Sequence, residues 1–231
     1  MAADMRRRAV LLGLALGAGA LAVPASATIP TVDARAGLRA ALVAAGDAAI
    51  ARLGLPGGFA DDPIVRIRLP GGLDRVREGL VEAGLGPLVE DLEARMNSAA
   101  ESVMPATRPL LQVATETLAI EEPEEILAGA DDAATRLLER EAGNALATEI
   151  GPVVAQALVA TGANSAFDAF VAEYSRLPLM PSISGKLTGH VVDSSLAALF
   201  LYMGEQERAI RRDSAARTTE LLRALFGGGR A

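Results

Sequence analysis

The sequence predicts an all-α protein, a single-domain bundle of about eight helices, and three observations support this prediction. Hydrophobic residues make up 51% of the 231 residues, but aromatic residues only 3%, and tryptophan is absent. Most apolar residues are alanine, leucine or valine, which suits closely packed helices better than sheets, because sheets favour aromatic and β-branched residues. Finally, a helical apolar periodicity recurs along most of the chain, whereas one short run alternates as a strand does.

The first 27 residues have the pattern of a secretory signal peptide. Arginines at positions 6–8 precede an apolar run over 9–23, and Ala25-Ser26-Ala27 forms an A-x-A cleavage site behind Pro24. We expect cleavage after Ala27, which leaves 28–231 as one helical domain in the periplasm. The arginines allow the twin-arginine route as well as general secretion. An uncleaved membrane anchor is the alternative, although the run is short for a membrane span.

Charge and cysteine content narrow the possible partners. Removal of residues 1–27 takes away three arginines and one aspartate, which changes the formal charge from −7 to −9. An acidic surface repels phosphate backbones, so we expect no nucleic-acid partner. The chain has no cysteine, so it forms no disulfide and carries no cysteine-linked lipid. No later apolar run reaches spanning length, and we expect that the processed chain is not an integral membrane protein.

Apolar stripes, turn signals and capping residues predict the helices in order. Prolines are expected to disturb two of them. Pro105 removes a backbone donor and should break or kink the third helix, and Gly151-Pro152 should bend a long later helix. The expected helices cover 33–53, 73–83, 87 to Pro105, a fourth through 110–118, 121–129, 132–158, one capped by Asn164, 186–211, and one capped by Ser214 that ends at Gly227.

One segment near 64–70 departs from the helical pattern. Its apolar residues Val65, Ile67 and Leu69 alternate with arginines, as in a strand. A lone strand leaves its backbone groups unpaired, so it must find a partner strand, lie extended against helices, or pair across a dimer. Because no second strand signal is present, we expect a short extended or hairpin segment.

Two groups of polar residues interrupt the apolar helical sequence. Asn97 and Glu101 are four residues apart on one helical face at the edge of the core, where they need hydrogen-bonding partners. Arg108 or Arg136 could supply a charged partner. The group then forms either a structural network that fixes helix register or a polar cluster at the mouth of a cavity.

The second group surrounds Asp131 and Asp132. These aspartates could cap a helix, where its dipole favours negative charge, or they could bind a hard cation such as Ca²⁺ or anchor a basic partner. The spaced acids of an EF-hand loop are missing. The candidate binding residues are therefore Asn97, Glu101, Arg108, Asp131, Asp132, Thr135 and Arg136.

The sequence signals for a catalytic triad or a zinc site are weaker. The charged run over 205–213 is typical of a solvated helix end, with Glu207 and Arg211 as an i,i+4 pair. His190 is the only histidine, and a catalytic triad would need it beside Asp193 and Ser194, but no G-x-S-x-G turn is present. One histidine and no cysteine disfavour zinc. The sequence therefore indicates no catalytic residue, no metal ligand and no identifiable cofactor.

Several blocks in the mature chain occur in a recognisable order: Leu53-Gly54, Gly57-Gly58-Phe59, Val65-Arg66-Ile67, Leu69-Pro70, Met96-Asn97, Ala99-Ala100-Glu101, Pro105, Asp132-Ala133-Ala134-Thr135, 205–213 and 216–222. In these blocks the chain resembles the bacterial exported family known as domain of unknown function 4197. The resemblance implies an all-helical envelope protein and no established activity. This chain has Leu137 and Leu138 where the family pattern favours aromatic residues, and Ala197-Ala198 in place of an Asp-Gly pair.

Two functions fit these observations. The first is a non-enzymatic envelope module that binds a partner protein, a peptide or an apolar molecule between helices. The alternative is a carboxylate-based or metal-dependent hydrolase that uses Glu101, Asp131 and Asp132, with Arg108 or Arg136 for substrate charge. The alternative requires these carboxylates to converge in one cleft, and the first requires a cavity or an exposed apolar groove.

Overall fold

The computed structural model describes residues 31–70, 73, 77–177 and 186–227, and every regular element in these ranges is helical. This confirms the predicted all-α bundle. The expected signal peptide lies outside the described residues. The elements are α1 (Thr31–Leu53), α2 (Arg77–Glu82), α3 (Gly86–Thr117), α4 (Pro123–Ala128), α5 (Ala133–Ala160), α6 (Ala163–Tyr174), α7 (Leu187–Arg212), the 3₁₀ turn η2 (Ser214–Ala216) and α8 (Glu220–Phe226).

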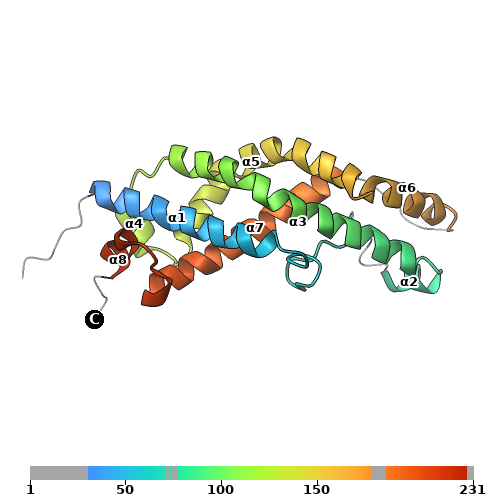
Figure 1. The fold of residues 1–231 in the computed structure, drawn as a ribbon, viewed down its shortest axis with the longest axis horizontal. Coiled ribbons are helices and arrows are strands. Elements are labelled where there is room, and N and C mark those ends of the chain that lie inside the picture. Colours follow the sequence, from blue (N-terminus) through green and yellow to red (C-terminus); the bar gives the residue numbers. More distant parts are fainter. Residues whose placement is uncertain (1–30, 71–72, 74–76, 178–185, 228–231) are drawn as a thin grey trace, which may run out of the picture.

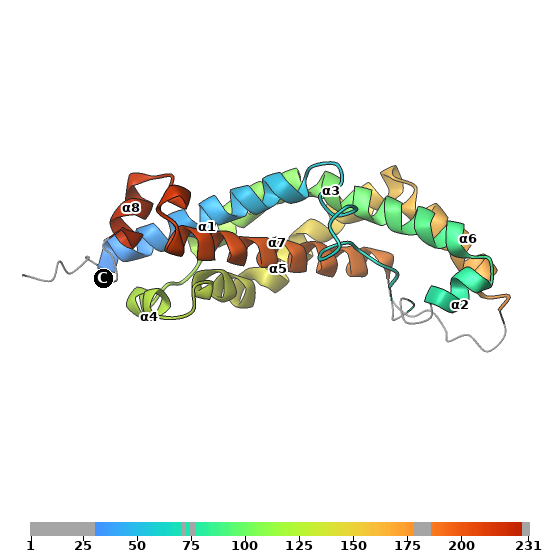
Figure 2. The ribbon, with the colours of Figure 1, turned by 90° about the horizontal axis from the view of Figure 1, so that it is seen from below.

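The four long helices α1, α3, α5 and α7 run along the length of an elongated molecule (Figure 1). Helix α3 packs against α1, α5, α6 and α7, and α7 packs against both α1 and α5. The short helices α4 and α8 lie at one end, and α2 and α6 lie at the other (Figure 2). Helix α7 therefore has a long neighbour on each side, and its polar residues can reach both.

Small residues let the long helices approach closely. Helix α1 buries Ala41, Ala45 and Ala49 in the core. At Gly46, a Cβ atom would lie 2.5 Å from a methyl carbon of Leu111 on α3, so a side chain there would require Leu111 to shift. The alanine-rich, aromatic-poor composition therefore produces close helix packing, as the sequence predicts.

Helix α3 is longer than the sequence predicts, because it continues through Pro105 and Pro109 instead of breaking. Each proline removes one backbone hydrogen bond at a cost of about 3 kcal/mol in an isolated helix. Packing of α3 against four other helices offsets this cost. The predicted third and fourth helices are thus one helix. Helix α5 continues through Pro152, as expected for the long helix over 132–158.

Two predicted caps are wrong. Helix α6 has Gly162 at its N-cap, in the left-handed region with φ of 73°, so Asn164 lies within the helix. Ser214 belongs to η2, and Thr219 caps α8 by accepting a hydrogen bond from the Leu222 N–H at 3.2 Å. In both cases a suitable residue a few positions away takes the cap, an ambiguity that the pattern of the sequence does not resolve.

No single described helix is both long and apolar enough to span a membrane. Helices α5 and α6 meet that requirement only when taken together, and they join at a bend of 72°.

Candidate functional site

The segment predicted to be extended, near 64–70, has a turn at 64–65 and no regular structure over 66–69. Helix α3 holds this segment, and Asn97 makes the central contact. The Asn97 side chain is fully buried. Its Oδ1 accepts the Ile67 N–H at 2.8 Å, and its Nδ2 donates to the Ile67 carbonyl at 2.8 Å. Nδ2 also donates to the Glu93 carbonyl at 2.7 Å. The amide thus supplies the donor and acceptor that a neighbouring strand would supply, so Ile67 needs no partner strand.

Two glutamates one helical turn away on either side complete this arrangement. Glu101 Oε1 accepts the N–H groups of Phe59 and Ala60, both at 3.1 Å. Glu93, which is fully buried, accepts the Leu69 N–H at 3.3 Å and forms an ion pair with Arg77. The i, i+4, i+8 spacing places all three side chains on one face of α3. Asn97 and Glu101 therefore form a structural network, one of the two alternatives that the sequence left open.

The predicted arginine partners of this network are wrong. Arg108 forms an ion pair with Asp47 of α1, and both side chains are about 40% exposed. Arg136 belongs to a different group on α5. The donors to Asn97 and Glu101 are instead backbone N–H groups of the loop after α1, where the sequence had suggested an arginine guanidinium. The Arg108 pair joins two helices at the surface and contributes about 0–1 kcal/mol.

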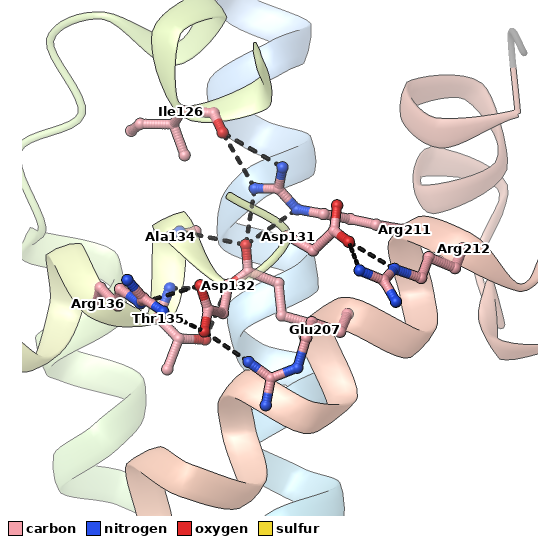
Figure 3. A network of polar contacts seen from close by, with 10 residues as sticks. Ile126, Asp131, Asp132, Ala134, Thr135, Arg136, Glu207, Arg211 and Arg212 are labelled. Atoms are coloured by element: carbon pink, nitrogen blue, oxygen red, sulfur yellow. Dashed lines mark hydrogen bonds and ion pairs between the residues drawn. The ribbon is translucent and has the colours of Figure 1, made fainter. Parts of the chain in front are cut away.

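The N-terminus of α5 is capped by a residue from another helix. Glu207 of α7 is 1% exposed, and its carboxylate accepts the N–H groups of Ala134 at 3.1 Å and Thr135 at 2.7 Å (Figure 3). The Thr135 hydroxyl donates to the same carboxylate at 2.7 Å. Asp132 occupies the N-cap position, but its side chain accepts no capping bond. Asp132 therefore holds the predicted N-cap position, but Glu207 and not an aspartate supplies the capping side chain.

Arg211, one turn after Glu207, completes the connection to α4. Its guanidinium is 6% exposed and pairs with Glu207 at 2.7 Å. It also donates to the carbonyls of Ile126 at 3.2 Å and Leu127 at 3.3 Å, at the C-terminal end of α4. One buried ion pair thus satisfies donors at the start of α5 and acceptors at the end of α4. Every nitrogen of the Arg211 guanidinium has an acceptor.

The sequence predicted the Glu207–Arg211 pair but not its burial. We read residues 205–213 as a solvated helix end, and the structure shows that Glu207 faces the core. A signal was present, because Phe200, Met203, Glu207 and Ile210 follow the spacing of an apolar helical stripe. A charged residue on such a stripe requires buried partners.

Asp132 joins two arginines on the solvent side of this pair. Its carboxylate binds Arg136 through contacts of 3.0 Å and Arg208 of α7 at 2.5 Å. The Asp132 side chain is 11% exposed, whereas those of Arg136 and Arg208 are 67% and 36% exposed. Asp131 pairs with Arg212 at the surface. The second predicted group thus forms ion pairs that join α5 to α7.

A hollow of about 270 Å³, here called the α5–α7 hollow, opens beside Asp132. Predicted binding residues Asp132, Thr135 and Arg136 line it from α5. Phe200 and the 38% exposed Leu201 give it an apolar side on α7. Ala197, one of the positions where this chain departs from the family pattern, also lines it. Its full lining is Asp132, Thr135, Arg136, Glu139, Ala197, Phe200, Leu201, Gly204 and Arg208.

A second hollow, of about 650 Å³, lies between α4 and α5. It contains four glutamates, and the hydrogen bond from Glu125 raises the pKa of Glu122. None of the polar residues singled out from the sequence lines it. Of these two hollows, the α5–α7 hollow is therefore the one that is lined by predicted binding residues.

A third polar group fastens the loop after α1 to α7. The Tyr202 hydroxyl donates to Asp62, and the Arg52 guanidinium lies over the Tyr202 ring, 3.7 Å from its centroid. This hydrogen bond lowers the pKa of Asp62. Burial and the hydrogen bond to Asp62 raise the pKa of Tyr202 to about 12, so the folded protein holds this proton to a higher pH than an exposed tyrosine does.

The carboxylates that a hydrolase would use have separate partners in the described ranges. His190 Nε2 lies 2.8 Å from the Arg68 carbonyl, so its ring helps to hold the segment near 64–70. Glu101 contacts the loop, while Asp131 and Asp132 contact arginines of α5 and α7. Within these ranges, no three His, Cys, Asp or Glu side chains are grouped as a metal site requires. The carboxylates therefore do not converge.

The fold and these groups define a class: an all-helical protein whose buried polar residues join its helices. The chain matches the model of the family described as "Protein of unknown function (DUF4197)" over residues 28–227, and it belongs to that family. No curated protein and no solved structure matches the chain.

Proposed function

We propose that this protein is an exported, non-enzymatic module of the cell envelope, which binds a partner through the α5–α7 hollow. The proposal rests on a difference between two kinds of polar side chain: those whose hydrogen bonds lie inside the protein, and those that border an open hollow. Asn97 and Glu207 bond to backbone groups inside the protein. Arg136 and Arg208 instead border an open hollow beside exposed Leu201. An accessible apolar surface with a few fixed polar groups is typical of a binding site.

The proposed location rests on the sequence of residues 1–27. A positive segment, an apolar run and an A-x-A site in that order direct export, by either the twin-arginine or the general route. The lack of cysteine agrees with a protein that reaches the envelope without disulfides and without a cysteine-linked lipid. N-terminal sequencing of the processed protein tests this part, and we expect Thr28 as its first residue.

The alternative, a carboxylate-based or metal-dependent hydrolase, needs Glu101, Asp131 and Asp132 in one cleft. Glu101 bonds to the loop after α1, whereas Asp131 and Asp132 pair with arginines, so no observation favours this alternative over binding. A glycosidase would also need a pair of carboxylates about 5–10 Å apart around its substrate. The α5–α7 hollow offers Asp132 and Glu139, but both arginines of the hollow already bind Asp132.

Native mass spectrometry of the mature protein, purified from its own envelope without added ligand, tests the proposed function. We expect a bound mass or a partner subunit that is lost on denaturation. The same experiment on an Arg136→Gln, Arg208→Gln double variant should show less of it, and an Arg140→Gln variant should match the wild type. Arg140 is an exposed α5 arginine that pairs with Glu141, so it controls for the loss of charge. Equal occupancy in all three proteins would contradict the proposed site.

A further inference from the structure

The two arginines of the α5–α7 hollow have donor capacity that Asp132 does not use. Arg136 approaches Asp132 through its Nε and one terminal nitrogen, and Arg208 through one terminal nitrogen. Within the described part of the chain, neither guanidinium bonds to another acceptor. A guanidinium carries five N–H donors in a fixed plane, so each arginine keeps at least two N–H groups for an outside acceptor. Arg211, by contrast, is saturated and buried.

Asp132 also fixes where these donors lie. One carboxylate that is 11% exposed holds both guanidiniums at 2.5–3.0 Å. Free arginine side chains lose rotamer freedom when they are ordered, and this loss is a cost of binding. Because the internal ion pairs already restrict both side chains, a bound anion would not bear that full cost. The pair is therefore preorganised for an acceptor in the hollow.

The surroundings select the type of anion. Glu139 also lines the hollow and makes no ion pair among the described residues, so the four charged side chains sum to a formal charge of zero. Anion binding therefore depends on directed N–H donors and not on a positive field. Asp132 and Glu139 repel a phosphate, which carries about −1.5 to −2, more strongly than a carboxylate with one charge. Phe200 and Leu201 offer apolar contact next to the arginines.

We infer that the α5–α7 hollow binds a carboxylate carried on a short apolar group, with Arg136 and Arg208 as the donors. The volume of about 270 Å³ fits the end of a molecule, such as a peptide terminus or an aliphatic acid, more closely than a whole large ligand. The inference rests on the proposed function and names the chemistry of its ligand.

A titration followed by nuclear magnetic resonance of the arginine Nε–H groups tests this inference on the mature chain. The probes are N-acetylleucine, its uncharged relative N-acetylleucinamide, hexanoate and inorganic phosphate. We expect saturable shifts at Arg136 and Arg208 with both carboxylates, and at least about tenfold weaker binding in Arg136→Gln and in Arg208→Gln. Arg140→Gln should bind as the wild type does. Tighter binding of N-acetylleucine than of hexanoate would indicate a peptide terminus, and the reverse an aliphatic acid.

Three results would overturn the inference: equal binding of the amide, binding of phosphate as tight as that of the carboxylates, or no saturable shift. The proposed function has a separate outcome. If the arginine double variant loses its partner in native mass spectrometry while the carboxylates do not bind, the hollow is a binding site for a different chemistry. If neither experiment responds to these arginines, both proposals fail.

Discussion

In two regions of this molecule, side chains of a neighbouring helix bond to backbone groups that have no partner in their own element, but among the described residues only the second region has polar side chains beside an open hollow. At the segment near 64–70, side chains of α3 bond to backbone groups that have no strand partner. At the junction of α4 and α5, Glu207 and Arg211 of α7 bond to the free ends of two helices. The first region uses its polar atoms internally. The second keeps two partly exposed arginines beside a hollow.

This difference gives a criterion, burial together with bonding to backbone groups, that separates structural polar residues from candidates for binding. Asn97 and Glu207 are both buried and bonded to backbone, so their chemistry serves the fold. Arg136 and Arg208 retain donors that face solvent. Substitutions should therefore affect folding in one set and binding in the other, and four predictions follow this division from the largest effect to the smallest.

Replacement of Glu207 should have the largest effect on stability. Glu207→Leu leaves the Arg211 charge and the Ala134 and Thr135 N–H groups buried without their acceptor. We expect the free energy of unfolding to fall by about 3–5 kcal/mol in urea denaturation. Glu205→Leu, two residues earlier on α7, replaces a 42% exposed side chain whose nearest charged partner is 4.0 Å away, and it should cost at most about 0.5 kcal/mol. Similar losses in both variants would refute the special role of Glu207.

Replacement of Asn97 should act on the other region. Asn97→Leu leaves the N–H and carbonyl of Ile67 unpaired, and each such buried group costs about 1–3 kcal/mol, so we expect a loss of about 3 kcal/mol. Hydrogen exchange of the Ile67 amide should accelerate, while that of Thr135 changes only with global stability. The control is Ser98→Leu on the exposed face of α3. Unchanged protection of Ile67 would show that Asn97 does not hold the segment.

Tyr202 gives a smaller and pH-dependent effect. Its pKa is raised to about 12 from an ordinary value of 10.0, so the folded state holds the proton more tightly than the unfolded state. This contribution to stability is complete below about pH 10 and is lost as the pH rises through 12. Tyr202→Phe should cost about 1 kcal/mol at neutral pH and remove its share of that alkaline decline.

Ultraviolet titration of the Tyr174→Phe variant would follow Tyr202 alone, since the chain has two tyrosines. Ionisation near pH 10 in the folded protein would contradict the described contact with Asp62.

The arginines of the α5–α7 hollow should matter least for stability. Arg136→Gln and Arg208→Gln each remove a partly exposed ion pair, and each should change the free energy of unfolding by about 0–1 kcal/mol. Thermal and urea denaturation of the single variants checks this. A loss of 3 kcal/mol or more, comparable with that expected for Glu207→Leu, would place these arginines in the structural set and remove the contrast between the two regions.

The sequence predicted the class of fold and most helices because these depend on local periodicity. It also identified Asn97, Asp132 and Arg136 as polar residues that need an explanation. Their partners were not predictable from spacing. Glu207 lies 72 residues from Thr135, and Ile67 lies 30 residues from Asn97, so each contact depends on which helices pack together. The continuity of α3 through Pro105 was not predictable for the same reason, because packing against other helices outweighs the helix-breaking tendency of proline.

The central claim is that the partner binds at the α5–α7 hollow, and photo-crosslinking in the intact envelope tests it most directly. A photoreactive amino acid at Leu201 reports on the hollow, and the same group at Leu55, which is 61% exposed, reports on another surface. We predict a defined product from position 201 that the Arg136→Gln, Arg208→Gln double variant reduces, with no such dependence at position 55. No product at position 201, or one that is indifferent to both arginines, would contradict the claim.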